Sequence, residues 1–256
     1  MTSFEAVSLN THGNLKWSRT DNFRFTSGDS FCPVFLSELP SVLLSQSIAF
    51  VQQGGRYIPV AIQSLKSGEN YLVSDEGDWL TRYIPALYRA HPFLLANDEK
   101  GEKILCIQND ATTGQELESG ESFFDSEGNL SPAITDVMRY LSSLEKNKEH
   151  TFTICSQLQK MELLKPWKIQ FDLNEKLHEV NGLFQVDEEK FLDLSADQIF
   201  ELKNSRGLML IYSQLFSMQN ISRLITLTQQ KERNSEKAPT EVSFFDDSGS
   251  LNFDSI

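Results

Sequence analysis

The chain has 256 residues, of which 36 are acidic and 23 are basic, so its formal net charge at pH 7 is −13. An acidic chain without a cluster of Lys and Arg cannot neutralise phosphates, which argues against nucleic acids and anionic membranes as partners. No stretch approaches the roughly 18 apolar residues that a membrane-spanning helix needs. We therefore expect no nucleic-acid partner and no integral membrane segment.

The first residues contain neither the basic nor the apolar run that begins a secretion signal, which favours a cytoplasmic location. The cysteines, Cys32, Cys106 and Cys155, are scattered, and no two have the short spacing of a metal site. Each lies among apolar neighbours, where a free cysteine behaves as a small hydrophobic side chain. We expect buried, reduced thiols.

Residues 1–110 are predicted to form a β-rich region. The segments 48–51 and 57–62 flank Gly54-Gly55 and predict a hairpin. A short helix is expected at 39–45, with Pro40 in its first turn. Further short strands are expected at 71–73, 93–95 and 104–107.

Residues 111–130 are polar and acidic and predict a connecting loop. Within this loop, Asp125-Ser126-Glu127-Gly128-Asn129 partly matches a calcium-binding loop. The glycine stands two positions too early for the sharp turn of such a loop, so a solvated turn is favoured. We expect no bound metal and no cofactor.

From residue 131 the apolar period changes to 3.6, which indicates amphipathic helices in region 131–231. One helix is expected to begin with Ser131 as its N-cap and Pro132 as its first helical residue. A second helix is expected from about 151 to 165. A second β piece is expected at 167–173 and then 179–186, around Asn181-Gly182.

The segment Ser195-Ala196-Asp197-Gln198 predicts a capping box, with Gly207 expected just past the end of that helix. The strongest helical stripe follows and runs to Ile225, and residues 232–256 form a polar tail. The predicted class is α+β: a β-rich N-terminal part with a short antiparallel sheet, followed by an amphipathic helical part with a second small β piece.

Several strings in this order resemble the SapC family of bacterial proteins. They are Gly68-Glu69-Asn70-Tyr71, the run from Arg82 to Phe93, Phe124-Asp125-Ser126-Glu127-Gly128, Leu163-Leu164-Lys165-Pro166-Trp167, the run from Gly182 to Leu194, and the run from Gly207 to Tyr212. The resemblance implies an association with a bacterial surface layer. It also implies genetic proximity to flavin-dependent halogenase-like enzymes, cupin-type oxygenases and outer-membrane receptors. It supplies no catalytic residues.

Aromatic and arginine residues are concentrated in one segment, as they are in binding hot spots. The candidate binding residues are Trp79, Arg82, Tyr83, Tyr88, Arg89 and His91. The alternative is that the aromatic rings complete the core while the arginines reach solvent along its surface. If these residues do bind a ligand, we expect them to line a groove for a peptide or protein.

A second candidate is a short internal repeat. Ser122-Phe123-Phe124-Asp125 recurs as Ser243-Phe244-Phe245-Asp246, and in both copies a Gly and a Leu follow at the same spacing. Chance and common turn chemistry are the alternative. Because exposed Phe pairs are costly in water, we expect Phe123, Phe124, Phe244 and Phe245 to dock. The docking site of the tail is its own domain, a second copy in a homo-oligomer, or another protein.

The leading interpretation is a non-catalytic binding or accessory protein of a bacterial cell-surface, surface-layer or uptake system that recognises a peptide or protein. One alternative is an accessory or carrier protein for halogenase-like or cupin-type modifying enzymes. The other is an enzyme with an unrecognised site, for instance one that pairs Cys106 with His91. No catalytic residue is assigned.

Overall fold

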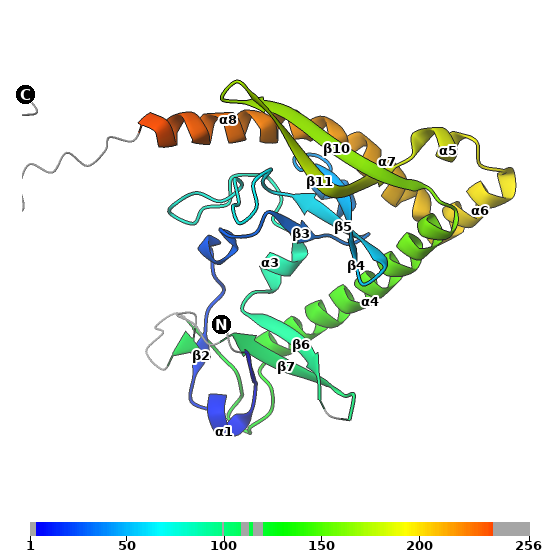
Figure 1. The fold of residues 1–256 in the computed structure, drawn as a ribbon. Coiled ribbons are helices and arrows are strands. Elements are labelled where there is room, and N and C mark those ends of the chain that lie inside the picture. Colours follow the sequence, from blue (N-terminus) through cyan, green and yellow to red (C-terminus); the bar gives the residue numbers. More distant parts are fainter. Residues whose placement is uncertain (1–3, 99, 109–112, 115–119, 238–256) are drawn as a thin grey trace, which may run out of the picture.

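The computed structural model describes residues 4–98, 100–108, 113–114 and 120–237 (Figure 1). Antiparallel strands dominate its first half, and helices dominate the second. The predicted α+β class is confirmed.

The largest sheet has five antiparallel strands in the order β10-β11-β4-β5-β3. The hairpin of β4 (Ile48–Gln53) and β5 (Arg56–Ile62) is the predicted one. Its turn residues Gly54 and Gly55 have φ values of 56° and 75°. A two-residue hairpin turn of type I′ needs positive φ at both positions, and glycine adopts it without a Cβ penalty. The short strand β3 (Phe31–Pro33) closes this edge of the sheet.

The second β piece belongs to this same sheet, because Leu183 and Phe184 pair with Val51 and Phe50 of β4. It consists of β10 (Leu164–Leu173) and β11 (Lys176–Val186). The turn is Asn174-Glu175, with φ values of 51° and 60°, so β11 begins earlier than predicted. Gly182, with φ of 85°, lies opposite a register shift between Trp167 and Ile169. Asn181-Gly182 is therefore part of an irregularity within a strand, where glycine accepts the positive φ.

Two smaller sheets lie towards the N-terminal half of the chain. One has the order β1 (Phe4–Ala6), β7 (Lys103–Gln108) and β6 (Phe93–Asn97). The other has the order β8 (Thr113–Gly114), β2 (Lys16–Trp17) and β9 (Glu121–Ser122). The strand predicted at 71–73 is wrong, since only Val73 forms an isolated bridge, to Trp79. The run is apolar because all three side chains are buried, and not because it pairs in a sheet.

Short helical turns connect these strands. They are α1 (Leu9–His12), the 3-10 turn η1 (Arg24–Thr26), α2 (Leu39–Val42) and α3 (Ala86–Ala90). The prediction of a short helix with Pro40 in its first turn is confirmed by α2.

A single helix, α4 (Pro132–Lys160), replaces the two helices predicted between 131 and 165. Its start is as predicted, with the Ser131 side chain accepting the backbone N–H of Ile134 and proline in the first turn. The segment 133–160 contains neither glycine nor proline, so its polar middle does not interrupt the helix. In Figure 1, α4 runs diagonally from the small sheets to the helical end of the molecule. Its first half packs on a core around Phe93 and Phe123, and its second half on the core beneath the large sheet.

The C-terminal helices are α5 (Glu188–Leu192), α6 (Ala196–Ser205), α7 (Gly207–Ser217), the 3-10 turn η2 (Met218–Asn220) and α8 (Ile221–Lys237). The predicted capping box of Ser195 and Gln198 is confirmed. The expected end of α6 just before Gly207 is confirmed, but the left-handed residue that ends the helix is Arg206, and Gly207 begins α7. A Cβ on Gly207 would lie 2.7 Å from Leu202 Cδ2, so the glycine permits close packing of the two helices. The last helix reaches Lys237, within the segment predicted as tail.

Candidate functional site

A buried carboxylate, that of Glu38, accepts hydrogen bonds from the segment that carries the candidate binding residues. Glu38 is 4% exposed and accepts backbone N–H groups of Phe35 at 2.9 Å and of Ala86 at 2.8 Å. Its Oε2 also accepts the hydroxyl of Tyr83 at 3.1 Å, and that hydroxyl accepts an N–H of Arg89 at 2.8 Å. Glu38 thus joins α2 to the first residue of α3.

Burial is the main influence on the ionisation of this network. It raises the pKa of the Glu38 carboxyl, and the hydrogen bonds from Ala86, Phe35 and Tyr83 and the charge of Arg89 offset this only in part. Burial also raises the pKa of the Tyr83 phenol to about 12, with the nearby carboxylate of Glu38 adding to the effect. The network is therefore a fixed framework, with Tyr83 neutral at physiological pH.

A second polar network lies on the other side of α3. The hydroxyl of Tyr88 lies 2.9 Å from Asp29 Oδ2 and 2.9 Å from Gln63 Oε1. The amide of Asn70 donates to the same Gln63 oxygen at 2.9 Å and to the carbonyl of Thr26 at 3.1 Å. Together the two networks fix α3 against the loops at 23–30 and 63–70.

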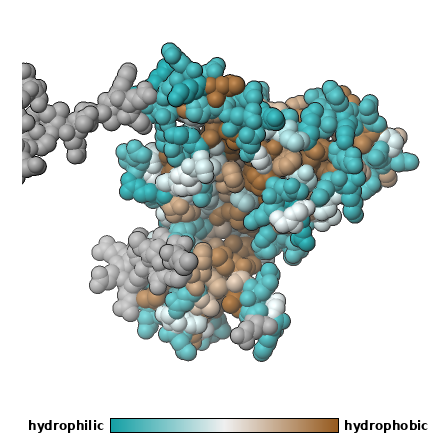
Figure 2. Space-filling model, viewed as in Figure 1, coloured by the Kyte–Doolittle hydropathy of each residue, from teal (hydrophilic) through white to brown (hydrophobic). Residues whose placement is uncertain are grey.

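In front of α3 lies an apolar groove of about 350 Å³, which we call the β6 groove. Its walls come from β1, the turn at 23–26, α3, β6 and α4, and its lining residues are Phe4, Phe25, Leu87, Ala90, His91, Pro92, Phe93, Leu94, Leu95, Leu141, Leu144, Glu145 and Lys148. Phe4, Phe25 and Leu87 are 46%, 41% and 36% exposed. On the face shown in Figure 2, apolar residues gather between the upper and lower parts of the molecule, in the region of α3 and β6. The groove therefore presents apolar side chains to solvent.

The groove follows the outer edge of β6. Consecutive side chains of a strand project to opposite faces of the sheet, so a groove lined by both Leu94 and Leu95 lies along the strand edge. β6 is the last strand of its sheet and pairs on one side with β7. Gln108 donates its backbone N–H to the Pro92 carbonyl, so the residues at every second position from Pro92 direct their backbone groups towards β7. The N–H and C=O groups of Leu94 and Ala96 therefore point to β7.

It follows that the N–H and C=O groups of Phe93, Leu95 and Asn97 point away from β7. Among the residues that the structure describes, none of these groups has a hydrogen-bond partner. An edge with free backbone groups beside an apolar helix face can accept an added strand. Here that helix is α4, through Leu141 and Leu144.

Only one of the six predicted binding residues lines this groove. His91 stacks on Phe25 with ring centroids 3.9 Å apart. Tyr83 and Tyr88 belong to the networks behind α3, and Arg89 lies over the rings of Tyr83 and Tyr140 at 5.3 and 5.7 Å.

The other two lie in the preceding loop. The indole N–H of Trp79 lies 2.8 Å from Thr81 Oγ1 and 2.9 Å from the Tyr83 carbonyl oxygen. Arg82 is exposed. The sequence located the segment, but most of its aromatic residues form the support of the groove, and a ligand-binding role for these six residues stays a prediction.

The first of the two Phe-pair segments docks on its own domain. Phe123 is fully buried and packs against His12 and Phe93 at 5.0 and 6.2 Å, while Phe124 is half-buried. Asp125 closes the turn that follows by accepting the backbone N–H groups of Glu127 and Asn129, each at 2.9 Å. Phe244 and Phe245 lie outside the described residues.

The cysteines are buried and unpaired, as predicted. Burial raises the pKa of Cys32 and Cys106, and it raises that of Cys155 to about 12. A thiol with a raised pKa is a poor nucleophile at neutral pH. Over the described ranges, no group of three or more His, Cys, Asp or Glu side chains is arranged to hold a metal ion.

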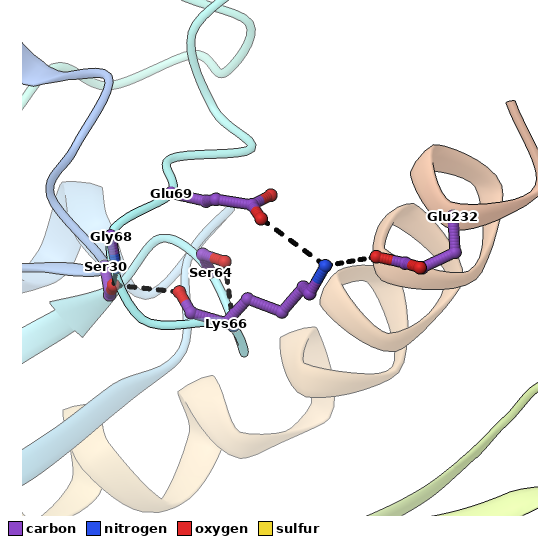
Figure 3. A network of polar contacts seen from close by, with 6 residues as sticks. All are labelled: Ser30, Ser64, Lys66, Gly68, Glu69 and Glu232. Atoms are coloured by element: carbon purple, nitrogen blue, oxygen red, sulfur yellow. Dashed lines mark hydrogen bonds and ion pairs between the residues drawn. The ribbon is translucent and has the colours of Figure 1, made fainter. Parts of the chain in front are cut away.

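A second groove, of about 680 Å³, opens between the loop at 64–68 and β11. Its loop wall is tied to α8, because Lys66 bridges Glu69 at 3.4 Å and also contacts Glu232 (Figure 3). Ser30 donates from its hydroxyl to the Lys66 carbonyl and accepts the backbone N–H of Gly68, both at 2.9 Å. We call this the Lys66 groove.

Comparison with known families gives a match over most of the chain. The SapC family model matches residues 7–224, which include the α3 framework, the lining of the Lys66 groove and all lining residues of the β6 groove except Phe4. The chain belongs to the SapC family. Searches of curated proteins and of solved structures found no match.

The described part of this SapC protein contains no helix with the length and apolar character needed to cross a membrane. Its groove depends on Phe4, Phe25 and Leu87, which lie in three separate segments. Leu87 lies in the run from Arg82 to Phe93 that the sequence singled out, but Phe4 and Phe25 stand in segments without such a signal, so the sequence did not predict that the three residues meet.

Proposed function

We propose that this SapC protein is a non-catalytic accessory protein of a bacterial cell-surface, surface-layer or uptake system. It binds an extended segment of a peptide or protein partner in the β6 groove. The observation that carries the proposal is the free edge of β6 beside the apolar face of α4. An extended ligand would hydrogen-bond to Phe93, Leu95 and Asn97 and place alternate side chains against the groove walls.

The composition of the groove supports a ligand with apolar side chains. Three of its walls offer partly exposed large residues, Phe4, Phe25 and Leu87, whose burial would favour binding by roughly 25 cal/mol per Å² of apolar area. The framework of Glu38 and Tyr83 holds α3 in place before the ligand arrives, which reduces the ordering cost of binding.

Selection of random displayed peptides on the full chain tests the binding activity. We expect selected peptides to slow hydrogen exchange at Leu95 and Asn97, and Leu87→Lys to weaken them about tenfold or more, since it puts a charge on an apolar wall. Leu177→Lys is the matched control, because Leu177 is 67% exposed and lies in β11 away from the groove lining. The proposal would be contradicted if the selected peptides bound the Leu87→Lys variant as tightly as the wild type, or if no peptide were selected.

Co-purification from the native host tests the cellular assignment. We expect surface-layer or envelope components to be retained by the wild-type chain and lost with Leu87→Lys. Retention of a halogenase-like or cupin-type enzyme instead would favour the accessory role in modification that the family resemblance suggests.

A further inference from the structure

We propose that the exposed aromatic side of α7 is a second interaction surface, which binds a basic segment of a partner protein. The segment carries apolar side chains with lysine or arginine beside them. This inference goes beyond the proposed function, because the surface shares no residue with the lining of the β6 groove.

Two aromatic rings of α7 lie together in solvent. Tyr212 and Phe216 are one helical turn apart, and their rings stack with centroids 5.7 Å apart and an interplanar angle of 19°. They are 44% and 61% exposed. The buried ring of Phe191 in α5 contacts Tyr212 edge-on at 5.5 Å, and the next residue of α5, Leu192, is exposed. We call Leu192, Tyr212 and Phe216 the α7 face.

The rings of the α7 face lie outside the core that this helix completes. On the opposite side of α7, Leu210 and Gln214 are fully buried, and Gln214 accepts the backbone N–H of Val186 at 3.0 Å. The position of α7 is therefore set without Tyr212 and Phe216. Large apolar side chains that gather in solvent are typical of interaction sites, because their burial on binding is favourable.

The surroundings of the α7 face are acidic. The chain from Asp187 to Arg206, which forms α5 and α6, has six acidic and three basic residues, so its net charge is 3 − 6 = −3. Two further residues that bridge to this stretch, Glu162 and Lys165, cancel one another. The segment 207–222, which includes the whole of α7, has no charged residue and leaves this negative charge uncompensated.

Part of this charge lies directly beside the apolar residues. Glu188 stands three and four positions before Phe191 and Leu192, so it is on the same side of α5. An arginine or lysine of a partner could contact this carboxylate and also stack on the ring of Tyr212 or Phe216, since the faces of aromatic rings attract cations.

Charge and position decide between the possible occupants. A second copy in a two-fold contact would bring the same acidic surroundings against themselves, and like charges at an interface disfavour binding. The chain beyond residue 237 has four acidic residues and no basic one. In addition, α8 has 17 residues, about 25 Å, and leads away from α5 and α6 in Figure 1. A basic segment from another protein is the occupant that the charge favours.

Binding of labelled synthetic peptides to the full chain tests this surface. The probes are three fluorescent peptides of equal length, built from Leu and Lys, from Leu and Glu, or from Ser and Lys in the same order. We expect the Leu–Lys peptide to bind at least about tenfold more tightly than either of the others, because it alone matches both the apolar side chains and the acidic surroundings.

Substitutions locate the binding. Phe216→Ser should weaken the Leu–Lys peptide about tenfold or more, whereas Leu177→Ser, at a similarly exposed position in β11, should not. Glu188→Gln/Glu189→Gln should also weaken it and reduce the effect of added salt. Glu149→Gln/Glu175→Gln is the matched control, since it removes the same charge from exposed positions of α4 and of the turn before β11.

Three outcomes would overturn the proposal. The first is equal affinity for the Leu–Lys and Leu–Glu peptides, and the second is an affinity that Phe216→Ser does not change. The third is a wild-type dimer in sedimentation that Phe216→Ser dissociates, because a second copy would then cover the α7 face. If Leu87→Lys abolishes binding and Phe216→Ser does not, the peptide lies in the β6 groove, so the proposed function stands and the α7 face is wrong.

Discussion

The carboxylate of Glu38 accepts the backbone N–H of Ala86 at 2.8 Å, and thereby caps a helix that lies 48 residues further along the chain. Because Leu87 is the next residue of α3, this contact sets the position of one wall of the β6 groove. A buried polar group that holds a binding surface in place leads to testable consequences for both stability and pH dependence.

Replacing Glu38 with Ala should lower the free energy of unfolding by about 2–4 kcal/mol, since it leaves two buried N–H groups and a phenol without their acceptor. Urea titration measures the change. Glu149→Ala is the control, because Glu149 is exposed on α4, and it should change stability by no more than about 0.5 kcal/mol. Equal effects of the two substitutions would show that the Glu38 contacts contribute little.

The stability that depends on Glu38 should decrease as pH rises. Burial raises the pKa of this carboxyl in the folded protein above its ordinary value near 4.5, which applies to the unfolded chain. At a pH between the unfolded and the folded pKa, the folded protein therefore binds more protons than the unfolded chain. The contribution is therefore complete below about 4.5 and is lost as the pH rises through the raised pKa. Urea titrations of the wild type and Glu38→Gln at several pH values measure it. The variant should lack this part of the pH dependence, and parallel curves would contradict the assignment.

The three thiols should resist modification in the native protein. Burial raises the pKa of Cys32, Cys106 and Cys155, so little thiolate is present at neutral pH. A colorimetric thiol reagent should react with none of them before unfolding and with three in urea. Cys155→Ala should cost about 1–3 kcal/mol, because the side chain is 2% exposed in the main core. Rapid labelling of any native cysteine would point to a reactive thiol.

The contact between Lys66 and Glu232 should contribute only modestly to stability. The two side chains are 39% and 23% exposed, and ion pairs with such access to solvent contribute about 0–1 kcal/mol. A double-mutant cycle with Lys66→Ala and Glu232→Ala should give a coupling energy in that range, which decreases with added salt. A larger coupling that does not respond to salt would mean that the pair is shielded from solvent.

Calcium and EDTA should leave thermal unfolding unchanged. In the turn that resembles a calcium loop, Asp125 accepts N–H groups of Glu127 and Asn129, and these hydrogen bonds lower the pKa of its carboxyl. A midpoint that rises by several degrees on addition of calcium would contradict this, because a ligand that binds only the native state must stabilise it.

Local chemistry was sufficient to predict several elements of this protein. Ser131 with Pro132 predicted the start of α4, Ser195 with Gln198 predicted a capping box, and Gly54-Gly55 predicted the first hairpin. Each signal depends on residues within a few positions of one another, since caps and tight turns are closed by short-range hydrogen bonds.

Tertiary structure decided the features that depend on distant residues. Neither the pairing of β11 with β4 nor the cap that Glu38 provides for α3 has a local pattern, because each joins segments that are far apart in the chain. The β6 groove is of the same kind: its walls come from five elements, and among the described strands β6 pairs on one side only, with β7. Sequence periodicity reports which side chains are buried, but the choice of the surface that buries them is made only when the whole chain packs.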